Sequence, residues 1–222
     1  MSYILNIESS STNCSISLSL NGKVVSIKEK NDKKYSHSTK LHIFIQEVLK
    51  ESNISIKELS SIAVSKGPGS YTGLRIGIAA AKGLCYALDI PLISVSTLLV
   101  LAKQLVVEKE DLIIPVIDAR RDEVYSGVYN SSYNKVREVF PEIINEESFS
   151  ELMLNNKLYF IGNGQEKCER LIKKNSNLIF SSNDTFPSAN EMAFLSFEKF
   201  KNSQFEDIVY FEPDYLKNFM PG

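Results

Sequence analysis

The start of the chain alternates apolar and polar residues in a pattern that predicts three short strands. Residues 3–8 and residues 14–20 each hold closely spaced apolar side chains. The pair Asn21-Gly22 favours a tight hairpin turn, and residues 23–28 supply a third strand after it. We therefore expect the fold to open with an antiparallel meander.

A helix follows, because apolar side chains next recur every three or four residues, the spacing of one buried helical face. The positions with this spacing are Leu41, Phe44, Ile45, Val48 and Leu49. Ser36 or Ser38 is placed to cap the start of this helix. The next elements that the pattern predicts are a strand at 61–65, a loop at 67–72, a helix at 73–88 and a strand at 92–95. Strands that alternate with helices favour a mainly parallel sheet.

The order of elements then begins again, which predicts two related α/β lobes. The second set comprises strands at 113–118, 123–129, 136–140 and 158–161 and helices near 147–154, 165–173 and 189–201. A carboxylate ends the first strand of each copy, Glu8 in one and Asp118 in the other. We expect a first lobe at 1–106 and a second at 107–222, whose C-terminal segment can return to the first. Two unrelated α/β modules are the alternative.

Composition excludes several classes of protein. With 222 residues, 43% of them hydrophobic, the chain can bury a core and form one or two domains. Its formal net charge of −2 argues against a protein that binds a nucleic-acid backbone tightly by itself. The first residues show neither a basic leader nor an apolar run of about 20 residues, which predicts a cytoplasmic location. Cys14, Cys85 and Cys168 are scattered, so we expect reduced thiols rather than disulfides or a zinc site.

A glycine-rich run lies between a predicted strand and a predicted helix. It consists of Gly67, Pro68, Gly69, Ser70, Tyr71, Thr72 and Gly73. Glycines allow close backbone approach, and the start of a helix favours an anion. The spacing matches neither the Walker pattern nor the dinucleotide pattern. A phosphate loop and a tight connection that never meets phosphate are both consistent with the run.

The helix predicted at 73–88 has two apolar faces. The face expected to meet the sheet holds Leu74, Ile78, Ala81, Cys85 and Leu88. The reverse face holds Ile76, Ala79, Ala80, Gly83 and Ala87. Such small residues suggest that another helix approaches closely, and Ile43 on the preceding helix would add to this interface. The alternative is that the helix at 41–49 covers the reverse face within the chain.

Two resemblances add to this picture. A duplicated meander-and-helix lobe resembles the actin, Hsp70 and sugar-kinase superfamily, in which the two first strands face each other across a nucleotide cleft. Residues 64–97, with the glycine run followed by Arg75-Ile76-Gly77, resemble the signature of the TsaB (YeaZ) family. Further matching segments are 4–11, 117–120, 123–125 and 215–218. Glu8 stands where the family often has Asp, and Lys217 stands where Arg is usual.

The resemblance implies a non-catalytic subunit in the cytoplasm, a pseudoenzyme. In that system TsaD transfers threonylcarbamoyl from its adenylate to N6 of the tRNA adenosine next to the anticodon, together with the ATPase TsaE. The metal-binding histidines of TsaD correspond to Thr97 and Leu101, which cannot replace imidazole. The implied partners are a TsaD-like subunit, a TsaE-like ATPase, tRNA through the complex and a second copy in a homodimer. The implied cleft carboxylates are Glu8 and Asp118, beside a vestigial phosphate loop, with no cofactor and no metal.

Two catalytic functions are the alternatives. A small-molecule kinase or ATPase of the same fold would need Mg²⁺-binding carboxylates, for which Glu8 and Asp118 are the candidates. A metalloprotease would need more than the two histidines, His37 and His42, which we expect to be surface or capping residues. Of these hypotheses, the sequence favours a non-catalytic binding subunit.

Overall fold

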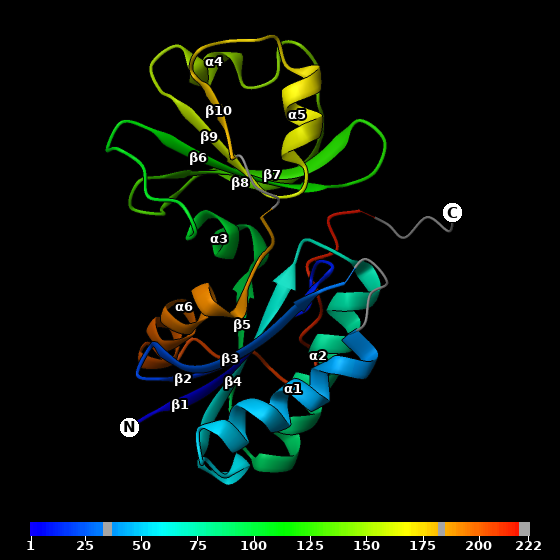
Figure 1. The fold of residues 1–222 in the computed structure, drawn as a ribbon, viewed down its shortest axis with the longest axis vertical. Coiled ribbons are helices and arrows are strands. Elements are labelled where there is room, and N and C mark those ends of the chain that lie inside the picture. The colour runs from blue at the N-terminus through cyan, green and yellow to red at the C-terminus, as the bar shows by residue number, and fades with distance from the viewer. Residues whose placement is uncertain (33–36, 182–184, 218–222) are drawn as a thin grey trace. The chain divides into compact units, whose positions relative to one another are not determined.

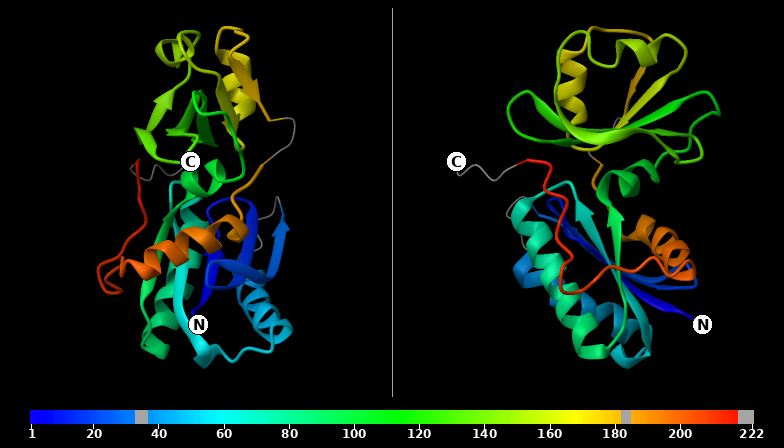
Figure 2. Two further views of the ribbon diagram at one scale, coloured as in Figure 1. Left: turned by 90° about the vertical axis from the view of Figure 1, so that its left-hand side faces the viewer. Right: turned by 180° about the vertical axis from the view of Figure 1, so that it is seen from behind.

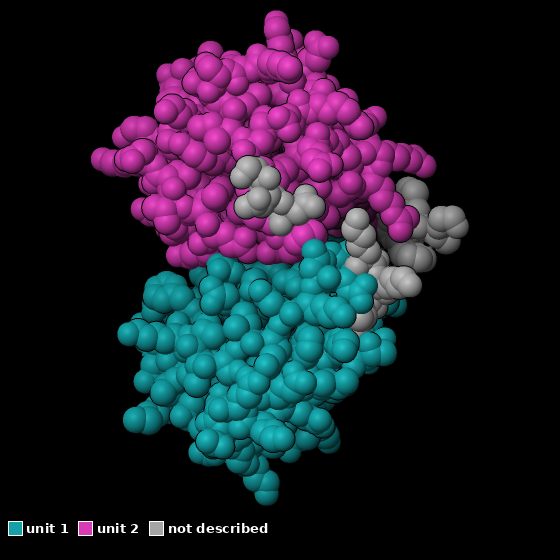
Figure 3. All heavy atoms as spheres, in the orientation of Figure 1, with its two compact units in different colours: residues 1–100, 187–214 teal, residues 101–186, 215–222 magenta. Residues whose placement is uncertain are grey.

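The chain forms two compact units, each with its own sheet (Figure 1, Figure 3). The computed structural model describes residues 1–32, 37–181 and 185–217. Unit 1 comprises Met1–Val100 and Pro187–Asp214, and unit 2 comprises Leu101–Phe186 and Tyr215–Gly222. Residues 187–214 thus lie with the first hundred residues rather than with the second half of the chain.

Unit 1 contains a five-stranded mixed sheet in the order β3-β2-β1-β4-β5. The strands are β1 (Tyr3–Glu8), β2 (Asn13–Leu20), β3 (Lys23–Asn31), β4 (Leu59–Gly67) and β5 (Leu92–Ser96). Strands β1 to β3 form the predicted antiparallel meander, and β4 and β5 extend it in parallel on the other side of β1. Asn21 and Gly22 both have positive φ in the predicted hairpin turn, at 50° and 82°.

Helices cover both faces of this sheet. One face carries α1 (His37–Glu51) and α2 (Tyr71–Leu88), and the other carries α6 (Ala189–Lys201) (Figure 1). The apolar side chains predicted for the first helix are all buried. Ser38 lies inside α1 rather than at its cap, and Ser36 lies outside the described residues. Two short helices were not predicted, a 3₁₀ turn (Ile56–Glu58) and α3 (Thr97–Ala102).

A polar seam joins α6 to its face of the sheet. Ser196 Oγ donates a hydrogen bond of 2.6 Å to Asn6 Oδ1. Asn6 Nδ2 in turn donates to Ser17 Oγ and Ser19 Oγ, and all four side chains are buried. Because each buried polar group has a partner, the seam avoids the cost of desolvation and specifies where α6 docks.

The segment after α6 crosses unit 1 and ends at the glycine run (Figure 2). The backbone amide of Glu206 donates to the carbonyl of Leu92 on the β5 edge. Lys82 on α2 then donates to the carbonyls of Val209 and Phe211. At the end of the segment, Lys66 and Asp214 form an ion pair of 2.9 Å, and the Asp214 amide donates to the Lys66 carbonyl. Residues 206–214 therefore brace β5, α2 and the end of β4.

Unit 2 repeats the sheet topology of unit 1. The strands are β6 (Leu112–Asp118), β7 (Glu123–Asn130), β8 (Lys135–Ile143), β9 (Leu158–Ile161) and β10 (Leu178–Phe180). From one edge of the sheet to the other their order is β8-β7-β6-β9-β10, which corresponds to β3-β2-β1-β4-β5 in unit 1. The parallel and antiparallel pairings also correspond. Two helices, α4 (Ser150–Met153) and α5 (Gln165–Leu171), accompany this sheet. The predicted two-lobed fold is confirmed, although β10 was missed because it has only three residues.

Cys14, Cys85 and Cys168 are free and buried, as predicted. Burial raises the pKa of the Cys85 and Cys168 thiols to about 12, so both stay protonated near neutral pH.

None of the helices in the described part of the chain is both long enough and apolar enough to cross a membrane.

Candidate functional site

The first candidate site surrounds the turn between β1 and β2, where Glu8 is completely buried. Glu8 Oε1 accepts hydrogen bonds from the backbone amide and the hydroxyl of Ser10, at 2.7 and 2.5 Å. Burial raises the pKa of Glu8, and the bonds from Ser10 oppose this rise without cancelling it. Ser65 also lowers this pKa, although Oε2 makes no hydrogen bond of normal geometry with the described residues. Such a carboxyl is a poor ligand for Mg²⁺, which prefers ionised oxygens and several waters.

The glycine run packs directly on this turn. A Cβ added at Gly69 or Gly73 would lie closer than 3.0 Å to the backbone of Ser10 or Ser9. The Ser70 amide donates to the Ser10 carbonyl at 2.6 Å, and Ser9 Oγ donates to the Gly73 carbonyl at 2.9 Å. Glycine is thus required here because two backbone segments touch, a requirement that needs no phosphate.

The run also positions the start of α2. Ser70 is the N-cap, and its hydroxyl accepts from the Gly73 amide at 3.2 Å. Gly67 has a φ of +111°, which favours glycine, whereas glycine is needed at position 69 because the Ser10 backbone lies so close. Tyr71 lies beneath the Arg75 guanidinium, with 4.1 Å between Arg75 Cζ and the ring centre. The use of Gly67–Gly73, including Pro68 and Thr72, as an anion site stays a prediction.

The two histidines are placed differently from one another. His42 is exposed, as expected. His37 is buried, so its assignment to the surface was wrong, while a capping role at the start of α1 stays a prediction. Its Nε2 lies 2.7 Å from the Ser11 carbonyl, just after the β1–β2 turn. Thr97 and Leu101 lie one turn apart on α3 and are both buried, and neither offers an imidazole. Among the described residues, no three His, Cys, Asp or Glu side chains are grouped to hold a metal.

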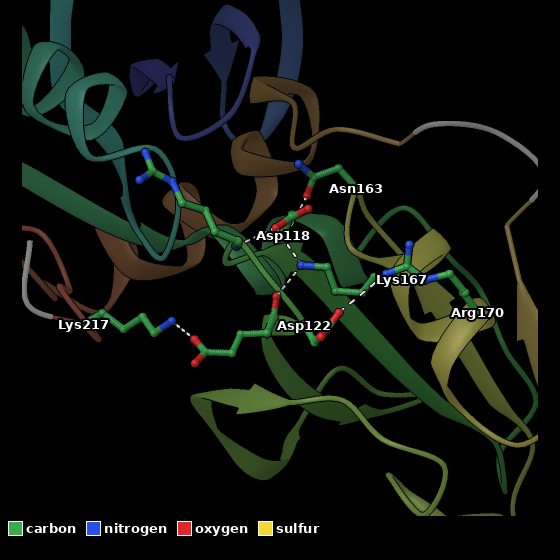
Figure 4. Close-up of polar contacts among 8 residues, drawn as sticks. Asp118, Asp122, Asn163, Lys167, Arg170 and Lys217 are labelled. Carbon is green, nitrogen blue, oxygen red and sulfur yellow. Dashed lines mark hydrogen bonds and ion pairs between the residues drawn. The ribbon is translucent and has the colours of Figure 1, made fainter. Parts of the chain in front are cut away.

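Unit 2 has a counterpart of the glycine run that sequence reasoning missed. Gly162, Asn163 and Gly164 join β9 to α5, and Gly162 has a φ of +109°. The Gly164 amide donates to the Val116 carbonyl at 3.1 Å. Asn163 Oδ1 accepts from the backbone amide of Asp118, which ends β6 (Figure 4). The signal that could have revealed this loop is a strand, a Gly-x-Gly and a helix in succession.

Asp118 belongs to a charged cluster, unlike Glu8. Lys167 Nζ lies 2.9 Å from Asp118 Oδ1 and also donates to the Glu123 carbonyl at 2.8 Å (Figure 4). The Lys167 side chain is only 9% exposed, whereas the Asp118 side chain is 44% exposed, so only the lysine side of this contact is shielded from water. Asp118 itself is exposed. That Glu8 and Asp118 face each other across a cleft stays a prediction.

The outer face of α2 is apolar and in part open. Ala79, Gly83 and Ala87 are exposed, and a Cβ added at Gly83 would meet nothing within 4 Å. Ile43 on α1 is 46% exposed. Two further residues proposed for this interface differ: Ile76 and Ala80 are partly buried and pack against the core. Ala80 was therefore wrongly assigned as pointing away from the core. The side of α2 that carries Ile76 and Ala80 packs against the core cluster, to which buried residues of α1 also belong.

Comparison with known proteins assigns a family to this chain. A family model described as TsaD, tRNA N6-adenosine threonylcarbamoyltransferase, matches residues 27–220. The Bacillus subtilis (strain 168) tRNA threonylcarbamoyladenosine biosynthesis protein TsaB is 32% identical over 190 residues, covering 83% of this chain and 81% of that protein. The chain belongs to the TsaB family. The TsaB protein of Escherichia coli K12 is 28% identical over 223 residues, covering 97% of this chain and 94% of that protein.

Solved structures agree with the TsaB assignment at the level of the fold. A Pseudomonas aeruginosa crystal structure, described as an uncharacterized protein with similarity to peptidase YEAZ, matches with a TM-score of 0.86 at 24% identity. The match covers 98% of this chain and 100% of that one. The TsaB relatives, at 28–32% identity over most of the chain, confirm the family resemblance inferred from the sequence.

Replacing Gly73 by Ala should lower the free energy of unfolding by roughly 1–3 kcal/mol, because the new Cβ would collide with the Ser9 carbonyl. Gly83→Ala is the matched control on the same helix, and it should raise stability by about 0.5–1 kcal/mol because its surroundings are open. Urea unfolding of the free chain measures both. A Gly73→Ala protein as stable as the wild type would contradict the packing role.

Replacing Glu8 by Gln should stabilise the protein more at pH 8 than at pH 4. The folded-state pKa of Glu8 is raised from its ordinary value of 4.5, so its contribution to stability is present below that value and is lost as pH rises through the folded pKa. Gln stays neutral and keeps an acceptor for the Ser10 amide. Unfolding free energies of both proteins across this pH range would show a difference that widens with pH. A constant difference would mean that Glu8 titrates normally.

Proposed function

We propose that this chain is a non-catalytic subunit in tRNA threonylcarbamoyladenosine biosynthesis and that it acts by binding a TsaD-like catalytic subunit. Its TsaB relatives are named for this pathway, and the matching family model is named for the transferase. The observation that carries the proposal is the exposed line of Ala79, Gly83 and Ala87 on α2. A solvent-facing helix surface normally holds charged or polar residues at such positions.

The groups that would perform chemistry support a binding role. Glu8 is buried and its pKa is raised, so ionisation is disfavoured where a kinase or ATPase would need a carboxylate for Mg²⁺. The positions that correspond to the metal-binding histidines are Thr97 and Leu101, both buried. Leu101 has no ligand atom, so these residues do not fit a TsaD-type metal. A stand-alone kinase or ATPase is therefore the weaker candidate.

The shape of α2 suits a partner helix. Small side chains along one line allow two helix axes to approach to about 8 Å. Tyr86, which is 83% exposed, and Arg75 flank this line, and both residue types are enriched at protein interfaces. Exposed Ile43 would extend the contact onto α1. The catalytic subunit is the proposed occupant, and a second copy of this chain is the alternative occupant in a homodimer.

The remaining partners follow from the pathway. A TsaE-like ATPase and tRNA would join through the complex rather than bind the isolated chain tightly. The mildly acidic net charge of −2 supports this, because tight binding of tRNA depends on neutralising many phosphates.

Replacing Ala79 by Arg should weaken binding to the TsaD-like subunit at least about ten-fold, or roughly 1.4 kcal/mol. The reason is that a long charged side chain would enter the centre of the contact and lose its water. Ala79 is exposed in the free chain, so the melting temperature of the Ala79→Arg protein should stay close to that of the wild type. Titration of the labelled chain with the catalytic subunit gives the affinity.

The matched control is Val106→Arg, which adds the same side chain at a residue of unit 2 that is 91% exposed. It should leave binding unchanged. A folded Ala79→Arg protein that binds as tightly as the wild type would remove α2 from the interface. A change in self-association alone would assign the surface to the homodimer instead.

A further inference from the structure

The turn between β6 and β7 presents two adjacent arginines in an unusual backbone conformation. Arg120 and Arg121 have φ values of 70° and 49°, and both are exposed. Residues other than glycine rarely adopt positive φ, and two in succession cost free energy. Such a conformation persists only where the surrounding structure holds it, and these conformations cluster at functional sites.

Four backbone contacts hold this turn. The Arg120 amide donates to Asp118 Oδ1 at 2.6 Å. The Ala119 amide donates to the Glu123 carbonyl, and the Glu123 amide donates to the Arg120 carbonyl, both at 3.1 Å. The carbonyl of Asp122 accepts from the Ile144 amide at 2.8 Å, just after β8. The turn is therefore a rigid platform for its side chains rather than a free loop.

Cations from elsewhere in unit 2 neutralise every carboxylate of the turn. The ion pairs are Asp118 with Lys167, Asp122 with Arg170 and Glu123 with Lys217 (Figure 4). The distances in the first two pairs are 2.9 and 3.6 Å.

The turn's own arginines are left without such partners. Within the described ranges, neither Arg120 nor Arg121 forms an ion pair, although three carboxylates lie within three residues of them. Two exposed positive charges are therefore not balanced by an ion pair, in a chain whose net charge is negative.

We propose that Arg120 and Arg121 bind phosphate groups of an RNA backbone. The planar guanidinium fork matches two phosphate oxygens, and a rigid turn presents both forks without ordering a loop. The exposed side chains of this turn are all charged, as is typical of phosphate contacts, whereas the core of a protein interface is apolar. That the RNA is tRNA rests on the proposed function. That the two arginines bind phosphate is argued from the turn itself and does not depend on that function.

The test is tRNA binding by the free chain at low salt, followed by fluorescence anisotropy of labelled tRNA over a series of salt concentrations. Arg120→Gln/Arg121→Gln should weaken binding several-fold. It should also reduce the slope of log affinity against log salt by about 1.4–1.8, the value for two lost phosphate contacts. Arg120→Lys/Arg121→Lys should keep most of the slope, because the charge remains and only the fork is lost.

The charge-matched control is Lys109→Gln/Lys174→Gln, which removes two exposed positive charges from other parts of unit 2. Its slope should change by less than half as much. The proposal would be overturned if Arg120→Gln/Arg121→Gln changed the slope no more than the Lys109→Gln/Lys174→Gln control does. A wild-type chain that binds no tRNA at any salt concentration would also overturn it. Melting curves identify any variant whose fold has changed. If the Gln double variant of the arginines is misfolded, Arg120→Lys/Arg121→Lys decides the outcome, because it preserves the two positive charges.

Co-purification with the TsaD-like subunit separates this inference from the proposed function. The Gln double variant should still bind that subunit. If it loses the subunit but binds tRNA like the wild type, the turn contacts protein, and the phosphate proposal is overturned. If the wild-type chain fails to bind the subunit, the proposed function fails, while the salt series on the free chain still decides the phosphate contact.

Discussion

The close packing of the β1–β2 turn against the start of α2 is the contact on which the rest of unit 1 depends. Gly69 and Gly73 allow the two backbones to touch, and the Ser70 amide and Ser9 hydroxyl tie them together. Interiors pack too densely to accept even one added carbon at such a point. This contact sets the position of α2 and therefore determines which of its faces meets the sheet. The opposite face, with Ala79, Gly83 and Ala87, stays exposed.

The two units share one sheet topology but differ in the residues at corresponding positions. Both place a glycine-bearing loop close to the end of the first strand of their sheet: Gly67–Gly73 packs on the turn after β1, and Gly162–Gly164 packs on β6 itself. In unit 1 the first strand ends in a buried carboxyl whose ionisation is disfavoured. In unit 2 it ends in Asp118, which is exposed and paired with Lys167. The duplicated fold thus keeps its geometry while the chemistry of the corresponding residues diverges.

The sequence predicted the elements whose apolar spacing is regular over several residues, which include β1 to β9 and all the longer helices. It missed α3 and β10 because six and three residues are too few to show a period. It recognised the glycine run but not the reason for Gly69, since that reason is the carbonyl of Ser10, far away in the chain. The pairing of Lys167 with Asp118 joins residues 49 positions apart, and no local pattern signals such a contact.

The central claim is that the chain contributes binding rather than catalysis, and reconstituted tRNA modification tests it most directly. Threonylcarbamoyl transfer to tRNA would be measured with the TsaD-like and TsaE-like proteins in the presence and absence of this chain. Phosphate release from Mg-ATP would be measured for the chain alone. We expect that the chain alone gives neither product nor phosphate and that its addition to the other components raises product formation. Phosphate release by the chain alone, or product formation that is independent of the chain, would contradict it.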